Sequence, residues 1–447
     1  MGQFLSNGLD ISSTEPAVGV ALARFFERLM RLGQGMEEIL SDVDHMPSEP
    51  GLRLAAGFFW LFGQTPSAQS AASGHLHQAR MQESRLNARE RSWLRALDLW
   101  LAKRFDESAT AFEEITAEWP DDLPALRAAE FLYYVLGQQY SGPRFLAHCN
   151  RLAPRHLGHP DFLAIYAFAN ELSGQVAQAR SLAEHAIAMR AVNPWAQHAM
   201  EHVLLWEGSS DTAAALMESW LDQWPDVART VHCHNAWHVA IMHLDRLEGD
   251  RAFAVYDAHV WGRTPDFVVE QLDAIAFLWR CEMAGFAVEG ARWESILPYI
   301  RPVCDTLFMP FATAHYAYAF ARGADHDGLA SLLHTVRTRA SQKDEEAIRV
   351  WRPVGQGIVQ ASAHLGLGEV REAASLFEPL MPLMTQIGGS DAQDDLFRFA
   401  FVESLSRSGH KADATAYLRE RLRHKVASPL EEELIRRLQP PALPARQ

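Results

Sequence analysis

Hydrophobic residues along this chain recur every three or four positions, in blocks as long as helices. Runs that alternate with a period of two, as in half-buried strands, are few and short. Glycine, proline, asparagine or aspartate separates the blocks, as expected of turns between helices. The pattern therefore predicts an almost wholly α-helical protein.

The first part of the chain predicts separate helices before any repeat is visible. We expect helices over about 14–32, 50–63 and 66–83, where apolar positions follow the helical period. A helical hairpin follows, with helices over about 87–104 and 106–119. The hairpin is the first unit that resembles a repeat.

A recurring glycine and alanine identify the architecture of the remainder. The alanine follows the glycine after five positions, which would let the chain reverse and two helices approach closely. The unit that starts at Gly208 also has Met217 and Trp220 at the bulky positions of a tetratricopeptide repeat. The other units have this pair at Gly174–Ala179, Gly249–Ala254, Gly368–Ala373 and Gly409–Ala414.

We therefore expect an all-α, tetratricopeptide-like solenoid of helical hairpins, wound into a right-handed superhelix. Residues 1–85 would be N-terminal helices that pack on or cap the solenoid. Residues 86–438 would be the repeats, and residues 439–447 a disordered tail. Each hairpin would cover the apolar face of the next.

The most chemically distinctive stretch contains two pairs of histidines, each four residues apart. His198 and His202 would lie on one face of a helix, and so would His234 and His238. If the two helices are neighbours, the four imidazoles would converge on a pocket in the concave face. They could hold a divalent metal there, such as zinc, iron or manganese. The alternatives are acid–base groups, contacts to a ligand, or structural histidines.

His198, Glu201 and His202 also form an HxxEH sequence, as in inverted zincins, where the histidines bind zinc and the glutamate is the general base. Glu201 does not lie on the helical face that the two histidines share, which weakens this interpretation. A third ligand would have to come from further along the chain. The candidates are His234, His238, Asp257, His259 and Asp273.

Two other histidine-containing segments suggest chemistry. Cys233, His234 and Asn235 have the ingredients of a thiol–imidazole–amide catalytic site. Neighbouring helical residues point about 100° apart, so Cys233 would need a histidine from another repeat. A buried, inert cysteine is the alternative. His315 is expected on the far wall of the same cavity, or else in a core hydrogen bond.

A glycine-rich segment, IGGS, precedes one of the last helices. Ser390 and Gln393 predict a capping box at the start of that helix. The alternative is an anion site at the helix N-terminus, which the carboxylates that follow make less attractive. The remaining candidates are Arg280 and Arg352 as anchors for a carboxylate, and Trp195 and Trp237 as pocket walls.

Composition narrows the functional classes. The formal net charge of −15 argues against nucleic acid or an anionic membrane as the main partner. No apolar stretch reaches the roughly 18–20 residues of a membrane span, and we see no secretory signal. Gly2 and Ser6 fit the short N-myristoylation pattern. Four scattered cysteines without a CxxC pair suit a reducing compartment, so we expect a cytoplasmic protein.

Several short motifs together resemble the tetratricopeptide repeat protein 38 family, over about residues 10 to 420. The resemblance implies a tetratricopeptide-like superhelix and says little about function. The motifs are ISST (11–14), the HxxxH of His198 and His202, CHNAWH (233–238), YDAH (256–259), LD followed by FLWR (within 272–280), ARWESILP (291–298) and IGGSDAQDDLF (387–397).

The chain departs from the family pattern at polar positions. It has FATAH at 311–315, where the family usually has FNDAH. Asp391 and Asp394 stand where the IGGS segment usually has a histidine and an arginine, and Glu201 stands where a small residue is common. We infer a specialised branch with a divergent pocket.

Two functions of different kinds are compatible with these patterns. The first is a His-rich pocket that binds or transforms a small molecule, by metal-assisted hydrolysis or proton transfer. The second is a non-catalytic scaffold for a protein or peptide partner. A homodimer would suit either. We favour the first function, with His198, Glu201, His202, His234, His238, Asp273 and His315 as the catalytic candidates.

Overall fold

The computed structural model describes residues 3–4, 8–224, 226–304 and 308–439. Gly2 and Ser6 of the myristoylation pattern lie outside the described residues, and so do residues 440–447 of the expected tail. The described chain is helical almost throughout. Its sheet is a single antiparallel pair, β1 (Gln3–Phe4) and β2 (Asp10–Ile11). The predicted all-α class is confirmed.

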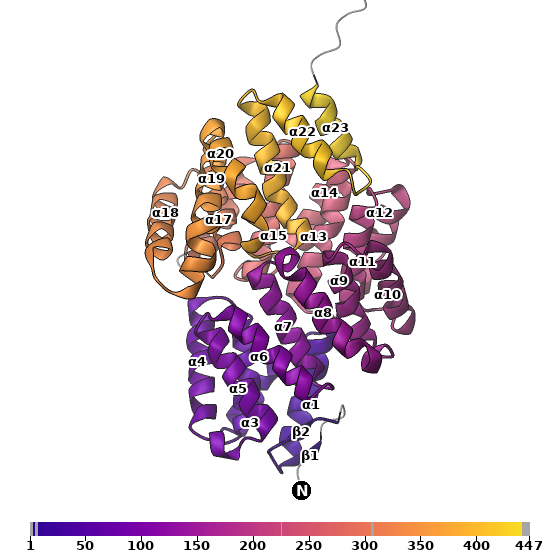
Figure 1. Cartoon of the computed structure of the whole chain (residues 1–447), viewed down its shortest axis with the longest axis vertical. Helices are drawn as coiled ribbons and strands as arrows, with labels where there is room; N and C mark the ends of the chain where they lie inside the picture. The colour runs from indigo at the N-terminus through magenta and orange to yellow at the C-terminus, as the bar shows by residue number, and fades with distance from the viewer. Residues whose placement is uncertain (1–2, 5–7, 225, 305–307, 440–447) are drawn as a thin grey trace, which may run out of the picture.

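The N-terminal helices form one end of the molecule, opposite the C-terminal helices (Figure 1). Proline in the first turn begins several of them, where no helical N–H bond is lost. Helix α1 packs on α3 and α7, so these helices lie against the hairpins. Their bounds are α1 (Pro16–Arg31), α2 (Glu38–His45), α3 (Pro50–Leu61), α4 (Pro66–Arg80) and η1 (Glu83–Arg85).

Successive helices then pack in pairs, and each pair packs on the next, which confirms the predicted tetratricopeptide-like solenoid. The first half contains α5 (Ala88–Leu101), α6 (Phe105–Glu118), α7 (Leu123–Leu136), α8 (Gln138–His156), α9 (Pro160–Leu172), α10 (Val176–Met189), α11 (Pro194–Trp206), α12 (Asp211–Glu218) and η2 (Leu221–Gln223). The second half contains α13 (Arg229–Asp245), α14 (Gly249–Val255), η3 (Tyr256–Val260), α15 (Val268–Ala284), α16 (Gly290–Ile300), α17 (Pro310–Arg322), α18 (His326–Ser341), η5 (Ala347–Gly355), α19 (Gln356–Gly366), α20 (Val370–Phe377), η6 (Glu378–Gln386), α21 (Asp391–Arg407), α22 (Lys411–Arg421) and α23 (Pro429–Leu438).

One expected turn is built differently from the others. Gly174, Gly208, Gly368 and Gly409 have left-handed φ angles of 74–97°, as a glycine turn requires. In the unit of Gly249 the left-handed residue is instead Leu247, with φ of 63°. The buried alanine that follows this turn is Ala252, whereas Ala254 is exposed. The expected pair Gly249–Ala254 is therefore wrong, and the unit is shifted by two residues. Gly249 is needed because a Cβ there would lie 2.5 Å from Phe286.

The IGGS segment (387–390) is hydrogen-bonded to the α7–α8 turn and leads into α21. Gly388 and Gly389 both have left-handed φ angles, of 106° and 92°. The Gly389 N–H donates to the Tyr134 carbonyl at 3.0 Å, and its carbonyl accepts from Gln138 at 2.8 Å. Ser390 and Gln393 form the predicted capping box. The first turn of α21 is therefore held against the α7–α8 turn.

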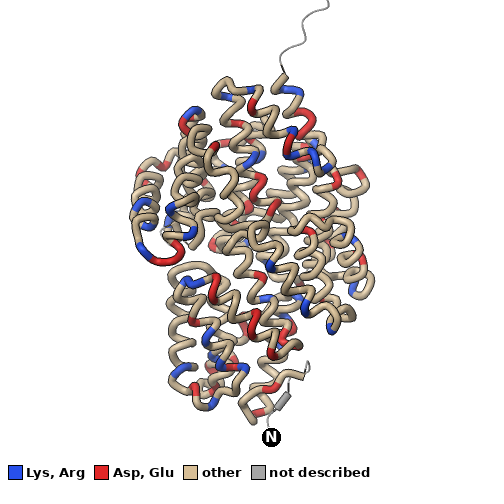
Figure 2. Tube along the Cα trace, viewed as in Figure 1, with Lys and Arg blue, Asp and Glu red and all other residues tan. Residues whose placement is uncertain are grey.

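Charged residues of both signs are interspersed along the described helices (Figure 2). The negative net charge is therefore spread over the molecule rather than gathered in one segment. None of the described helices is long and apolar enough to cross a membrane.

Candidate metal centre

The two histidine pairs meet because α11 and α13 pack side by side. The His202 ring centroid lies 4.6 Å from that of His238 and 4.7 Å from that of His198. The His234 centroid lies 4.9 Å from that of His238 and 5.1 Å from that of His198. The structure therefore brings all four imidazoles into one cluster, which we call the histidine cluster.

The register of the two helices explains this meeting. Helix α13 has 17 residues and α11 has 13, so α13 is one turn longer. Measured from the left-handed turn residues, His198 lies 10 residues before Gly208 and His238 lies 9 residues before Leu247. These two histidines are therefore level with each other, and His202 and His234 lie one turn away in opposite directions.

Three of the histidines form a group of metal-ligand geometry. One ring nitrogen from each of His198, His234 and His238 lies within 4.8 Å of the others. Both ring nitrogens of His198 and of His238 are buried with no hydrogen-bond partner among the described residues. His234 Nδ1 lies 3.1 Å from both carboxylate oxygens of Asp273. A carboxylate that orients one ring nitrogen leaves the other available, as for metal-bound histidines.

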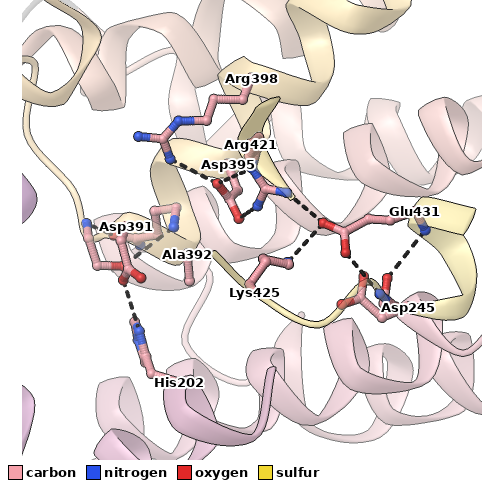
Figure 3. A network of polar contacts seen from close by, with 12 residues as sticks. His202, Asp245, Asp391, Ala392, Asp395, Arg398, Arg421, Lys425 and Glu431 are labelled. Atoms are coloured by element: carbon pink, nitrogen blue, oxygen red, sulfur yellow. Dashed lines mark hydrogen bonds and ion pairs between the residues drawn. The ribbon is translucent and has the colours of Figure 1, made fainter. Parts of the chain in front are cut away.

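His202 belongs to a second group, which includes two carboxylates that we did not expect. His202 Nδ1 lies 3.0 Å from Asp391 Oδ1 and 3.4 Å from Glu171 Oε2. Glu171 comes from α9. Asp391, which faces His202 in Figure 3, is the first residue of α21. One ligand atom from each of these residues lies within 4.8 Å of the others. The two groups are contiguous, because the His202 ring contacts the rings of the first group.

Burial and charge set different protonation states in the two groups. Burial, helped by neighbouring positive charge, lowers the pKa of His198 and His238 well below the usual value. Both are therefore neutral near pH 7, which is the form that binds metals. Burial also opposes the charging of His202, but Asp391 and Glu171 outweigh it and raise its pKa to about 10. Burial, then the charge of Asp391, raises the pKa of Glu171 to about 8.

Aromatic side chains enclose the histidine cluster. The Trp195 ring stacks on His198, with centroids 4.3 Å apart, and the Trp237 ring is parallel to His234 at 5.6 Å. Phe168 packs edge-on against His198 at 4.9 Å. The cluster is therefore largely buried. Its exposed margins are His234, whose side chain is 15% exposed, and Asp391, at 16%.

Other candidates lie apart from this cluster. His315 Nδ1 bonds to the Phe311 carbonyl at 2.8 Å, and its ring contacts Phe311, Trp279 and Phe397. None of its described contacts reaches the four histidines. Asp257 forms an exposed ion pair with Arg292. The candidate third ligands His259 and Asp257 are thus engaged elsewhere, His259 with His232 at 3.2 Å.

Glu201 and Cys233 are buried beside the cluster in forms that disfavour the roles first considered. Neither carboxyl oxygen of Glu201 has a hydrogen-bond partner in the described structure, and burial raises its pKa well above the usual value. The Cys233 thiol donates to the Val260 carbonyl at 3.2 Å. Burial, then the charge of Asp273, raises its pKa as well. A thiol in this state is a poor nucleophile.

The two arginine candidates differ in position. Arg280 donates to the Ala392 carbonyl, one residue after Asp391, and lies 5.7 Å from the centre of the Trp237 ring. It therefore ties α15 to the first turn of α21. Arg352 donates to the carbonyls of Ala340 and Gln342, at the end of α18. These bonds hold Arg352 at the end of α18 and do not connect it to the histidine cluster.

Comparison with known proteins adds little. No model of a protein family matches the chain. Among solved structures, the chain is similar to one chain in a structure of Naa15/Naa10 bound to HypK-THB, with 12% sequence identity and a TM-score of 0.22. The similarity covers 90% of this chain and 67% of that chain. A likeness this low carries no information on the histidine cluster.

Proposed function

We propose that this protein binds a divalent transition metal through His198, His234 and His238 and uses it for hydrolysis or another proton transfer on a small molecule. The observation that carries the proposal is the convergence of buried ring nitrogens that make no hydrogen bond to described residues. Leaving such a group unsatisfied costs about 1–3 kcal/mol. Four of these nitrogens belong to His198 and His238.

The three imidazoles suit this role chemically. When bound by three neutral histidines, a metal such as zinc supplies a Lewis acid with an open position for water. The contact between Asp273 and His234 fixes the orientation of that ring. Trp195 and Phe168 exclude bulk water from the His198 side. A small molecule would approach through the exposed margin at His234.

The first test is metal content. Protein purified without a histidine tag should contain at least one equivalent of zinc, iron or manganese by elemental mass spectrometry. We expect His238→Ala to lose one equivalent of metal and His259→Ala, a matched change outside the cluster, to keep the wild-type content. An unchanged metal content in His238→Ala, or metal-free wild-type protein that takes up none on titration, would refute the proposal. A non-catalytic scaffold predicts that last result. If metal is found, the metal-loaded protein is screened for hydrolytic activity.

We also propose that the chain belongs to the tetratricopeptide repeat protein 38 family, as a branch with a divergent pocket. The support is that CHNAWH and IGGSDAQDDLF, two motifs that carry the resemblance, supply neighbouring parts of the same cluster. His234 and His238 come from the first motif, and Asp391 from the second. An experimental structure of a family member should place its corresponding segments against each other.

A further inference from the structure

The carboxylates beside His202, Glu171 of α9 and Asp391 of α21, have fewer cationic partners than Asp395 of α21. Asp395, one turn after Asp391 on α21, is bonded by both Arg398 and Arg421 (Figure 3). Asp391 and Glu171 have only His202 as a cationic partner among the described ion pairs. Two carboxylates therefore share one imidazole in a largely buried position, where uncompensated charge is costly.

The ligand atoms of this group also have unused capacity. Glu171 Oε2 and His202 Nε2 are buried and make no hydrogen bond within the described chain. A carboxylate oxygen offers two lone pairs, so the ion pair with His202 leaves room for a further partner. The helix start that supplies Asp391 is fixed by the capping box and by the Arg280 bond to Ala392. The group is thus rigidly placed.

We propose that Glu171, His202 and Asp391 hold a second divalent cation, next to the one at His198, His234 and His238. This inference rests on the proposed function, since it makes the whole cluster a two-metal centre. Metals in such centres are typically about 3.5–4 Å apart, and the ring contacts of His202 make the two groups close neighbours.

The two halves would select different cations. Three neutral imidazoles suit zinc and other borderline metals, whereas two carboxylates and one imidazole favour harder cations such as manganese or ferrous iron. A cation bound there would displace the protons that His202 and Glu171 hold near pH 7. The second group would then supply two negative charges, which the first group lacks. Manganese(II) is therefore the probe for the second half, and zinc for the first.

The experiment titrates metal-free full-length protein first with zinc and then with manganese(II). Zinc is followed by calorimetry, and bound manganese by the loss of the free-ion signal in electron paramagnetic resonance. We expect one equivalent of each in the wild-type protein. Asp391→Asn and Glu171→Gln should weaken manganese binding at least tenfold and keep the zinc equivalent. Asp257→Asn, a matched change at an exposed carboxylate, should keep both.

The outcomes separate the two proposals. Suppose that the wild-type protein binds zinc, that His238→Ala does not, and that neither the wild type nor any variant binds manganese. This result supports the proposed function and overturns the second site. Manganese binding that Asp391→Asn and Glu171→Gln leave unchanged also overturns it. Manganese binding that is lost in both variants while His238→Ala leaves zinc binding intact supports the second site and refutes the first. Near-ultraviolet circular dichroism identifies a variant that has not folded, and the other variant of the pair then decides.

Discussion

Helix α21 joins two buried polar regions that are built differently. Around Asp395, acidic side chains face basic ones: Arg398 and Arg421 bond to Asp395, while Arg421 and Lys425 bond to Glu431 (Figure 3). We call these residues the ion-pair network. In the histidine cluster, by contrast, several buried ring nitrogens find no partner in the described chain.

Whether the buried polar groups have partners indicates the role that each region can have. Buried polar groups that satisfy one another need nothing from outside, and removing one partner leaves a buried charge exposed to an apolar environment. Buried groups that are left unsatisfied are rare in folded proteins and require an explanation. The ion-pair network is thus suited to holding α21, α22 and α23 together, and the histidine cluster is suited to binding a ligand.

The largest effect is expected from breaking the ion-pair network. Arg421→Ala leaves the carboxylates of Asp395 and Glu431 without their shared partner, so it should lower the free energy of unfolding by about 3–5 kcal/mol. Urea unfolding measures this. Arg423→Ala, which removes an exposed pair with Glu420, should cost less than about 0.5 kcal/mol. Equal losses in the two variants would contradict the role of the network.

Metal should stabilise the protein through the histidine cluster alone. Zinc at one hundred times its dissociation constant should raise the free energy of unfolding of metal-free wild-type protein by about 2.7 kcal/mol. His238→Ala should abolish this gain, and Arg423→Ala should keep it. Urea unfolding with and without zinc provides the measurement. A gain that survives in His238→Ala would place the zinc elsewhere.

A smaller effect is expected from pH in the metal-free protein. The folded pKa of His202, about 10, exceeds the ordinary value of 6.5, so its contribution to stability is complete below about pH 6.5 and is lost as the pH rises through 10. Glu171, raised from 4.5 to about 8, acts in the same direction at lower pH. Stability should therefore fall between pH 7 and 10, by at most about 1.4 kcal/mol per pH unit for each proton released.

Asp391→Asn tests this pH dependence, because it removes a charge that holds the proton on His202. The slope of unfolding free energy against pH should become flatter in this variant. Asp257→Asn should keep the wild-type slope. If both variants keep it, the contact between Asp391 and His202 does not govern the titration.

The sequence was sufficient to predict the helical class, the hairpins and the candidates that are local in the chain, but it did not predict α2 (Glu38–His45). Spacing of four residues places His198 with His202 and His234 with His238, because helical geometry alone decides it. Whether the two pairs meet depends on how α11 and α13 are aligned along their axes. The glycine pattern predicted this alignment two residues away from the observed one, because Leu247 rather than Gly249 makes the turn after α13.

Glu171 and Asp391 were missed because long-range packing brings them to His202. Asp391 is 189 residues away from it in sequence, and no local period links the two. A signal was present, since Asp391 is one of the positions where the chain departs from the family pattern. Glu171 also lies on the first helix of a hairpin, three residues before a turn glycine. His315 was expected on the cavity wall because it lies on the first helix of a later hairpin. Aromatic side chains surround it there instead.

Because Asp391 is supplied by α21, the two halves of the centre become available at different times during synthesis. Helices α9, α11 and α13 emerge well before α21, so the four histidines can pack together before Asp391 has been synthesised. A nascent chain could thus bind a metal at His198, His234 and His238 before the second half of the centre exists. The second half would be complete only after the C-terminal helices have folded onto the rest of the protein. Loading of the two halves would then be ordered in time.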